Sequence, residues 1–205
     1  MLYDFLIDEY EKLEPIFISD ISGYSTDYIR QEFKRLTDEG KLNRLYNGVY
    51  YIPCKTILGT DGKVSIDKLI EKKYLFDNNN INGYYTGLYF ANMLGITSQN
   101  PACFEVCSNV ATTKQRKNNI MGFNLITYKP VVKITNENHK ELQFLDLMTN
   151  IDKYSEITLD EQKKKLNDYV TNNNLNFEII KEYLPLYPDR VYKNIYNGGL
   201  MNELV

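Results

Sequence analysis

The stretch STDYIRQEFKRLTDEGKLNRLYNGVYYIP, residues Ser25 to Pro53, decides the fold of the N-terminal part of this chain. Ser25 or Thr26 can cap a helix at its start, and Gly40 stands where a left-handed C-terminal cap is expected. Between these caps, apolar residues recur at helical spacing. The stretch therefore predicts a helix whose buried stripe is formed by Ile29, Phe33 and Leu36.

A β-hairpin is predicted directly after this helix. Asn47-Gly48 is a strong signal for a two-residue turn that has positive φ at both positions. With such a turn, Leu45 pairs with Tyr50 and shares a face with Ile52. That face can pack on the helices, and the other is expected to remain free. The free face would carry Arg44, Tyr46, Val49 and Tyr51.

Two further helices are expected upstream. Apolar residues from Leu2 to Leu13 recur at helical spacing and stop at Pro15, and a short helix is plausible around Ser19 to Ile21. Three helices followed by a hairpin form the winged helix-turn-helix arrangement, in which the third helix enters the DNA major groove and the wing touches the backbone. We expect this DNA-binding domain to span residues 1–55.

The face of the third helix opposite the buried stripe has side chains suited to reading DNA. Gln31 can read an adenine edge, and Lys34 or Arg35 can read guanine or hold phosphate. On the wing, Arg44 is a candidate phosphate contact, with Asn47 at the tip. The full set of candidate DNA-binding residues is Ser25, Thr26, Asp27, Tyr28, Arg30, Gln31, Lys34, Arg35, Arg44 and Asn47.

The same helix face also fits a simpler interpretation. Asp27 lies near Arg30, and Glu32 lies near Arg35, so the face can be an ordinary solvated surface with ion pairs along it. Many winged helices bind only protein. The attached Asn-Gly hairpin favours DNA binding as the hypothesis.

A second domain is expected over residues 56–205, after the Gly-rich connection TILGTDGKV. Helices are predicted from Ser65 to about Phe76 and within YYTGLYFANMLG, and the chain from His139 onward reads as helical. Strands are predicted at Phe104 to Val110, Phe123 to Tyr128 and Val131 to Thr135. The expected fold class is α+β: a winged helix-turn-helix, then an α/β domain with a small sheet and a helical C-terminal part.

The interval from Val106 to Asn136 contains five basic residues and no acidic one. A patch of this kind attracts phosphates, so it can extend a DNA footprint or hold an RNA or a nucleotide. The alternative is a solvated loop between two strands. The basic residues are Lys114, Arg116, Lys117, Lys129 and Lys133.

Composition limits where the protein acts. The chain has 205 residues, of which 43% are hydrophobic, and a net charge of −3. No apolar run approaches the ~20 residues of a membrane helix, and the first residues are acidic where a signal peptide has a basic flank. We therefore expect a cytoplasmic protein without a membrane partner.

No catalytic constellation is recognised, and neither a metal nor a cofactor is predicted. Cys54, Cys103 and Cys107 fit neither a disulfide framework nor a zinc site. His139 lies in a polar helix start without a nucleophile nearby in sequence, and LGTDGK lacks the spacing of a phosphate-binding loop. The expectation is a protein that is not an enzyme.

From Phe17 to Lys129 the chain resembles the AbiEi-like antitoxins of bacterial type IV toxin-antitoxin (abortive infection) systems. The first half of the resemblance lies in the winged helix and the second in NGYYTGLYFANMLGITSQNPACFEVCSN. The matching positions are Asp20, Gly23, Phe33, Leu36, Gly40, Leu42, Leu45, Gly48, Tyr50 and Pro53, then Gly83, Gly87, Leu94, Gly95, Thr97, Gln99, Pro101, Glu105, Asn109, Arg116 and Gly122.

The resemblance implies a two-domain antitoxin. Its winged helix would repress its own operon by binding inverted repeats in promoter DNA, and its second domain would counter a nucleotidyltransferase-like toxin without a stable complex. The alternative is a nucleic-acid-processing or nucleotide-handling enzyme subunit whose N-terminal module mediates contact. From Val131 onward the sequence has no specific resemblance to the family.

Overall fold

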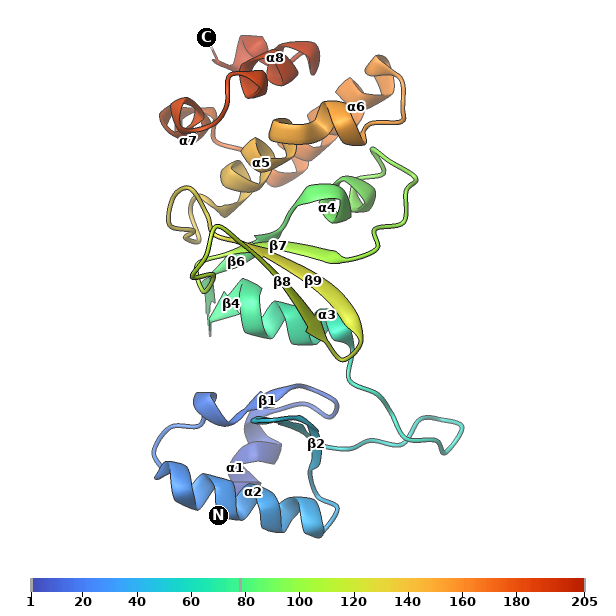
Figure 1. The fold of residues 1–205 in the computed structure, drawn as a ribbon, viewed down its shortest axis with the longest axis vertical. Helices are drawn as coiled ribbons and strands as arrows, with labels where there is room; N and C mark the ends of the chain where they lie inside the picture. Colours follow the sequence, from blue (N-terminus) through green and yellow to red (C-terminus); the bar gives the residue numbers. More distant parts are fainter. Residues whose placement is uncertain (1, 78, 205) are drawn as a thin grey trace. The chain divides into compact units, whose positions relative to one another are not determined.

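The structure, a computed structural model, describes residues 2–77 and 79–204 (Figure 1). The chain divides into two compact units, residues 1–72 and 73–205. Both helices and small sheets are present, so the α+β class is confirmed. The sequence placed the boundary after Lys55, whereas the first compact unit also includes residues 56–72.

The first unit contains three helical segments before its hairpin, in the order expected. The opening helix ends at Glu9, earlier than the predicted Leu13, and the short second segment is a 3-10 turn. The elements are α1 (Leu2–Glu9), β1 (Ile16–Phe17), η1 (Ile18–Asp20), α2 (Thr26–Asp38), β2 (Asn43–Tyr46), β3 (Val49–Tyr51) and α3 (Ile66–Ile70), which continues into the π-helical turn η2 (Glu71–Leu75).

Local chemistry sets both ends of α2. The Ser25 hydroxyl accepts a hydrogen bond from the backbone N–H of Tyr28 at 3.3 Å, which satisfies one of the unpaired donors of the first turn. At the other end Gly40 has φ +69°, and the N–H of Lys41 donates to the carbonyl of Leu36. The predicted cap residues and the predicted helix are confirmed.

The core of the first unit lies between α1, α2 and the sheet. Phe33 is fully buried and its ring meets that of Tyr50 edge-on, with 4.9 Å between the ring centroids. This contact fixes α2 against the hairpin. The buried cluster consists of Leu2, Leu6, Ile16, Ile21, Ile29, Phe33, Leu36, Leu42 and Ile52.

The hairpin register differs from the predicted one. The sheet has the order β1-β3-β2, and Arg44, not Leu45, lies opposite Tyr50 because β2 contains an irregularity between Arg44 and Tyr46. The predicted two-residue turn at Asn47-Gly48 is confirmed, because Tyr46 pairs with Val49 across it. Its predicted primed conformation is wrong, because Gly48 has φ +79° but Asn47 does not have positive φ. An extra residue in β2 shifts every side chain before it to the opposite face.

The burial of the hairpin also differs from the prediction, because Val49, which was expected on the free face, is only 2% exposed.

The segment after the hairpin contacts the N-terminal region. Lys72 forms an ion pair with Glu14 at 2.7 Å, and its Nζ lies 4.3 Å from the ring centroid of Tyr10. Residues beyond Lys55 therefore belong structurally to the first unit up to Lys72.

The second unit is built on a four-stranded sheet of order β6-β7-β9-β8, in which β7 and β9 are parallel and the other pairs are antiparallel. Helices α4 and α5 lie along one face of this sheet (Figure 1). The strands and first helix of this part are β4 (Phe76–Asp77), β5 (Asn80–Ile81), β6 (Gly83–Tyr85), α4 (Gly87–Met93), β7 (Phe104–Ser108), β8 (Gln115–Ile120) and β9 (Phe123–Tyr128).

Three sequence expectations for this sheet need correction. The polar segment QRKNNI forms the edge strand β8, where the sequence left a loop, and residues 83–85 form β6 where a helix was expected to begin. The strand predicted at residues 131–135 is absent, and that segment is irregular. Strands β7 and β9 and the helix that ends before Gly95 (φ +66°) are confirmed.

The C-terminal part is helical, as predicted. Its elements are α5 (His139–Tyr154), α6 (Leu159–Asn173), α7 (Phe177–Tyr183), η3 (Leu184–Leu186), α8 (Arg190–Asn197) and η4 (Met201–Leu204). Among the described residues, none of the helices has both the length and the apolar character that a bilayer-spanning segment needs.

A buried carboxylate connects α4 to the sheet. Glu105 on β7 accepts hydrogen bonds from the N–H of Leu88 at 2.8 Å and from the hydroxyl of Tyr128 at 2.9 Å. Gly87 has φ +63°, and a Cβ added there would lie 2.4 Å from the carboxyl carbon of Glu105. The absence of a side chain at Gly87 is thus what lets the carboxylate reach the start of α4.

Candidate nucleic-acid interface

The outer face of α2 is exposed as the sequence predicted. Ile29, Phe33 and Leu36 are buried, and the polar residues between them point to solvent. The helix is therefore amphipathic, with a polar surface available to a partner. The exposed members of the predicted set at the start of this helix and along it are Ser25, Thr26, Asp27, Tyr28, Arg30, Gln31, Lys34 and Arg35.

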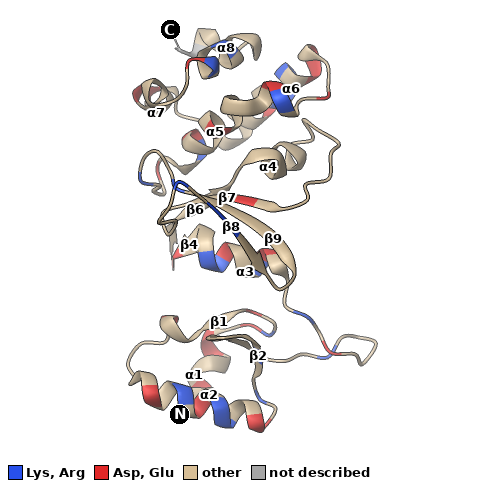
Figure 2. Ribbon diagram, viewed as in Figure 1, with Lys and Arg blue, Asp and Glu red and all other residues tan. Residues whose placement is uncertain are grey.

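Acidic and basic residues are interspersed along α2 (Figure 2). Helix α2 contains three basic and three acidic residues, so its side-chain charges sum to zero. Arg30 and Asp27 are 3.7 Å apart, and both side chains are mostly exposed. An ion pair at this distance between exposed side chains contributes little to the free energy of folding. Arg30 can therefore exchange Asp27 for another partner.

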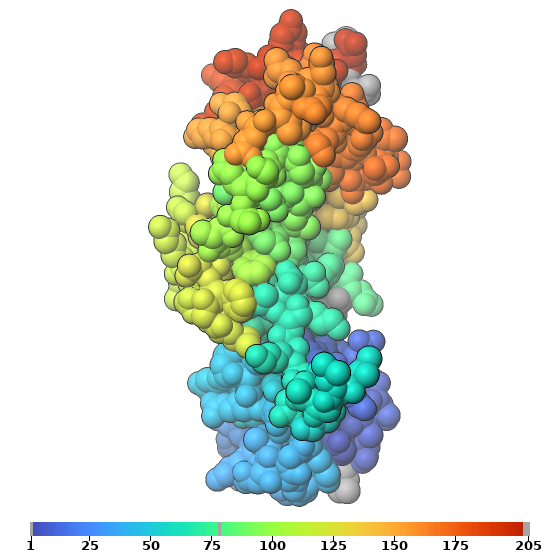
Figure 3. Space-filling view, turned by 90° about the vertical axis from the view of Figure 1, so that its right-hand side faces the viewer, coloured from blue at the N-terminus to red at the C-terminus, as the bar shows by residue number. Residues whose placement is uncertain are grey.

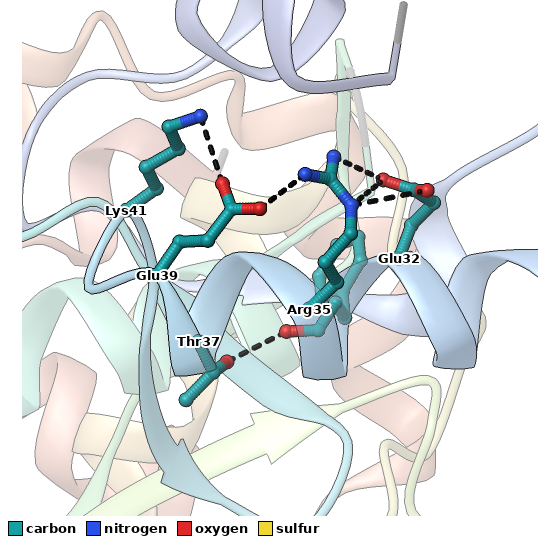
Figure 4. A network of polar contacts seen from close by, with 6 residues as sticks. Glu32, Arg35, Thr37, Glu39 and Lys41 are labelled. Carbon is teal, nitrogen blue, oxygen red and sulfur yellow. Dashed lines mark hydrogen bonds and ion pairs between the residues drawn. The ribbon is translucent and has the colours of Figure 1, made fainter.

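Arg35 is held in an ion-pair network at the end of the helix (Figure 4). Its guanidinium contacts Glu32 at 2.7 Å and also pairs with Glu39, which in turn contacts Lys41 at 2.8 Å. The hydrogen bonds that Arg35 donates to Glu32, and then to Glu39, raise the pKa of Arg35. The hydrogen bond that Lys41 donates to Glu39, followed by that from Arg35, lowers the pKa of Glu39. A phosphate would have to displace these carboxylates to reach Arg35.

Lys34 and Gln31 have a different environment. Both are exposed, and in residues 2–77 and 79–204 no carboxylate lies within ion-pair distance of the Lys34 ammonium. Lys34 thus presents its charge to solvent one residue away from the neutralised Arg35. Of the three predicted groups on the centre of this face, Lys34 and Gln31 are the two that can engage DNA without first losing a partner.

Two tyrosines lie together at the start of α2. The rings of Tyr24 and Tyr28 are stacked, with centroids 5.5 Å apart and 22° between their planes. They remain 42% and 39% exposed. Tyr28 belongs to the predicted DNA-binding set. Tyr24 lies four residues earlier, just before the helix begins, and its ring stacks on that of Tyr28.

The two candidate residues of the hairpin contact each other. Arg44 donates from Nη2 to the side-chain oxygen of Asn47 at 2.8 Å and from Nε to the carbonyl of Tyr46 at 3.4 Å. These bonds brace the turn and hold the exposed guanidinium near its tip. Arg44 is positioned for contact with a DNA backbone, but its Nε and Nη2 already donate hydrogen bonds within the hairpin.

The second basic patch is divided by the sheet. Arg116 and Lys117 are consecutive on β8, so their side chains point to opposite faces. The N–H of Lys129 donates to the carbonyl of Lys114, which brings those two residues side by side next to the strand ends. Lys133 lies in the irregular segment after β9. Residues around 110–130 form part of the molecular surface (yellow-green in Figure 3).

Comparison of the chain with protein-family models and with curated proteins gives no match. In the part of the chain that the structure describes, no three His, Cys, Asp or Glu side chains come together as metal ligands.

Proposed function

We propose that this protein is the antitoxin and transcriptional autorepressor of a type IV toxin-antitoxin operon. The first unit acts as a winged helix-turn-helix that places α2 in the major groove of promoter DNA, and the hairpin touches the adjacent backbone. The second unit counters a nucleotidyltransferase-like toxin.

The observation that carries the DNA-binding part is the outer face of α2. It combines an exposed amide at Gln31, suited to an adenine edge, with an exposed ammonium at Lys34, suited to guanine or phosphate. Both residues lie on a helix that is followed by a hairpin with Arg44 near its tip. Gln31 supplies base preference, and Lys34 and Arg44 supply affinity that depends on salt.

Support for the antitoxin part comes from the sequence resemblance, together with the structural roles of its positions in the second unit. Gly87 and Glu105 meet at the start of α4. Asn109 donates to the carbonyl of Ile134 and accepts from its N–H, both within 2.9 Å. These positions act together in holding the sheet and its connections.

Mobility shifts of full-length protein on DNA from its own promoter test the proposal. Lys34→Ala should lose about 1 kcal/mol of binding, roughly fivefold in affinity, and lower the salt slope by about one. Gln31→Ala should reduce the preference for promoter over unrelated DNA. Lys164→Ala, an exposed lysine on α6, is the matched control. Unchanged binding by Lys34→Ala and Gln31→Ala would show that α2 is not part of the DNA interface.

Antitoxicity is tested separately by co-expression with the toxin encoded next to this gene. Driven from an unrelated promoter, Lys34→Ala should restore growth as well as the parent does, because the second unit is unchanged. Loss of rescue with normal protein levels would mean that neutralisation depends on DNA binding.

A further inference from the structure

A cavity of about 370 Å³ opens in the second unit beside the edge strand β8. This is within the size range of small-molecule sites, roughly 300–1,000 Å³. Its lining comes from the end of η2, the loop after β7 and the outer two strands of the sheet. The lining residues are Lys73, Tyr74, Val110, Ala111, Thr112, Thr113, Arg116, Asn118 and Thr127. We call this cavity the β8 pocket.

Sheet geometry explains why these side chains meet. Arg116 and Asn118 are two residues apart on β8 and share one face of the sheet. Thr127 lies opposite Arg116 in the β8–β9 register and therefore points to the same face. Lys117 lies opposite Ile126, which is also opposite Glu105, so Lys117 points to the other face and does not line the pocket.

The remaining walls are fixed by one buried hydroxyl. Ser108 is fully buried and donates from Oγ to the carbonyl of Tyr74, which holds the end of η2 against β7. The same Oγ accepts from the N–H of Val110 at 3.4 Å, and the carbonyl of Ser108 accepts from the N–H of Ala111. The turn made by these bonds carries Thr112 and Thr113 to the pocket.

The pocket has two charged lining residues, and both are basic. Lys73 and Arg116 both line it, and none of the lining residues is Asp or Glu. Burial and, after it, the nearby Arg116 charge lower the pKa of Lys73. Within residues 2–77 and 79–204, Arg116 has no carboxylate at ion-pair distance. The Arg116 guanidinium is therefore available to an anion that enters the cavity.

We propose that the β8 pocket binds the phosphate group of a small molecule such as a nucleoside phosphate. Arg116 pairs with the phosphate through its charge and a planar pair of donors, and Lys73 is the second basic residue of the lining. The hydroxyls of Thr112 and Thr113 and the amide of Asn118 can donate to the remaining oxygens. Tyr74 also lines the pocket, and its ring centroid lies 5.5 Å from the Nζ of Lys73. This site lies in the second unit, whereas α2 belongs to the first, and the proposal does not depend on the proposed function.

Titration calorimetry of the full chain with pyrophosphate, ATP, GTP and inorganic phosphate tests this site. Binding by pyrophosphate as tightly as by the nucleotides indicates recognition of phosphate alone, and tighter nucleotide binding adds a contact to the base or sugar. Arg116→Gln should weaken binding by about tenfold or more, because it removes a charge-assisted contact. Lys117→Gln, on the same strand and the opposite face, should change it by less than about twofold.

Three results would overturn the assignment. The first is no heat of binding for any of the four compounds. The second is equal loss in Arg116→Gln and Lys117→Gln, which would indicate diffuse attraction to a basic surface. The third is binding only by a single-stranded oligonucleotide, which would make the patch an RNA or DNA surface. Thr112→Val provides a second variant that keeps all charges, and its binding should weaken while its unfolding temperature stays that of the parent.

Discussion

The guanidinium of Arg35 and the carboxylate of Glu39 form an ion pair across one turn at the C-terminal end of α2 (Figure 4). Glu32 holds the guanidinium from the other side, and Lys41 contacts Glu39. The predicted arginine is thus surrounded by acids from its own neighbourhood in sequence. Arg35 can contact DNA only when its ion pairs with Glu32 and Glu39 break.

Removing one of the acids should strengthen DNA binding. Glu39→Gln should raise the affinity for promoter DNA roughly threefold and steepen its salt dependence, because Arg35 and Lys41 then face the phosphates with less competition. Fluorescence anisotropy over a salt series measures both effects. Asp152→Asn, an exposed acid in the second unit, is the control and should leave the curves unchanged. Weaker binding by Glu39→Gln would indicate that the network positions Arg35 for contact.

The two adjacent cations of α2 should differ in importance. Arg35→Ala should reduce DNA affinity less than Lys34→Ala, because binding through Arg35 first breaks its pairs with Glu32 and Glu39. Loss of these surface pairs should also lower the free energy of unfolding by about 0.5 kcal/mol, which urea titration can measure. A larger binding loss for Arg35→Ala than for Lys34→Ala would reverse the assignment of roles on this face.

Gly87 should tolerate substitution poorly. An alanine there adopts an unfavourable positive φ and places its Cβ on the Glu105 carboxylate, so Gly87→Ala should cost roughly 3 kcal/mol or more. Gly122→Ala is the matched control, since φ is +87° and no atom lies within 4 Å of the added Cβ. The control should cost about 1 kcal/mol from backbone strain alone. Similar losses in chemical denaturation would show that the steric contact with Glu105 is unimportant.

Stability should depend on pH through Asp146 on α5. Burial raises the pKa of this carboxyl from 3.8 to about 6, although Tyr84 and Thr86 donate hydrogen bonds to it and Tyr187 lies close by. The folded state then binds a proton more tightly than the unfolded state does. The free energy of unfolding should therefore fall as pH rises through this range, by up to about 3 kcal/mol for an isolated group.

Asp146→Asn removes this titration. Its free energy of unfolding should differ little from that of the parent at low pH and exceed it at pH 7 and above, because the amide carries no buried charge. Thermal unfolding of both proteins across the pH range measures the difference, with Asp152→Asn as an exposed control. Parallel curves for the parent and Asp146→Asn would contradict the assignment.

Much of the first unit could be predicted from sequence because its signals are local. The caps at Ser25 and Gly40 and the buried stripe between them lie within one helix, and the structure has that helix at Thr26–Asp38. Exposure of Gln31 and Lys34 follows from the same periodicity. Periodicity could not indicate which charged side chains form ion pairs, because that depends on the side-chain conformations in the folded protein.

The hairpin and the edge strand show where local rules fail. Asn47-Gly48 was expected to form the turn with two positive φ values, but that conformation occurs at Met121 and Gly122 between β8 and β9. Strand β8 itself has no apolar alternation, since it lies at the edge of the sheet and most of it is exposed. Its identity as a strand comes from pairing with β9.

The sequence by itself determined the amphipathic helix, its caps, the mixture of acidic and basic residues along it and the helical C-terminal part, because residues a few positions apart decide each of these. Tertiary structure alone decided the hairpin register, the meeting of Gly87 with Glu105, and the β8 pocket. Lys73 and Arg116 are far apart in the chain and line one cavity only because η2 lies against the sheet whose edge strand is β8. Contacts of this kind depend on long-range packing, which no local pattern of residues specifies.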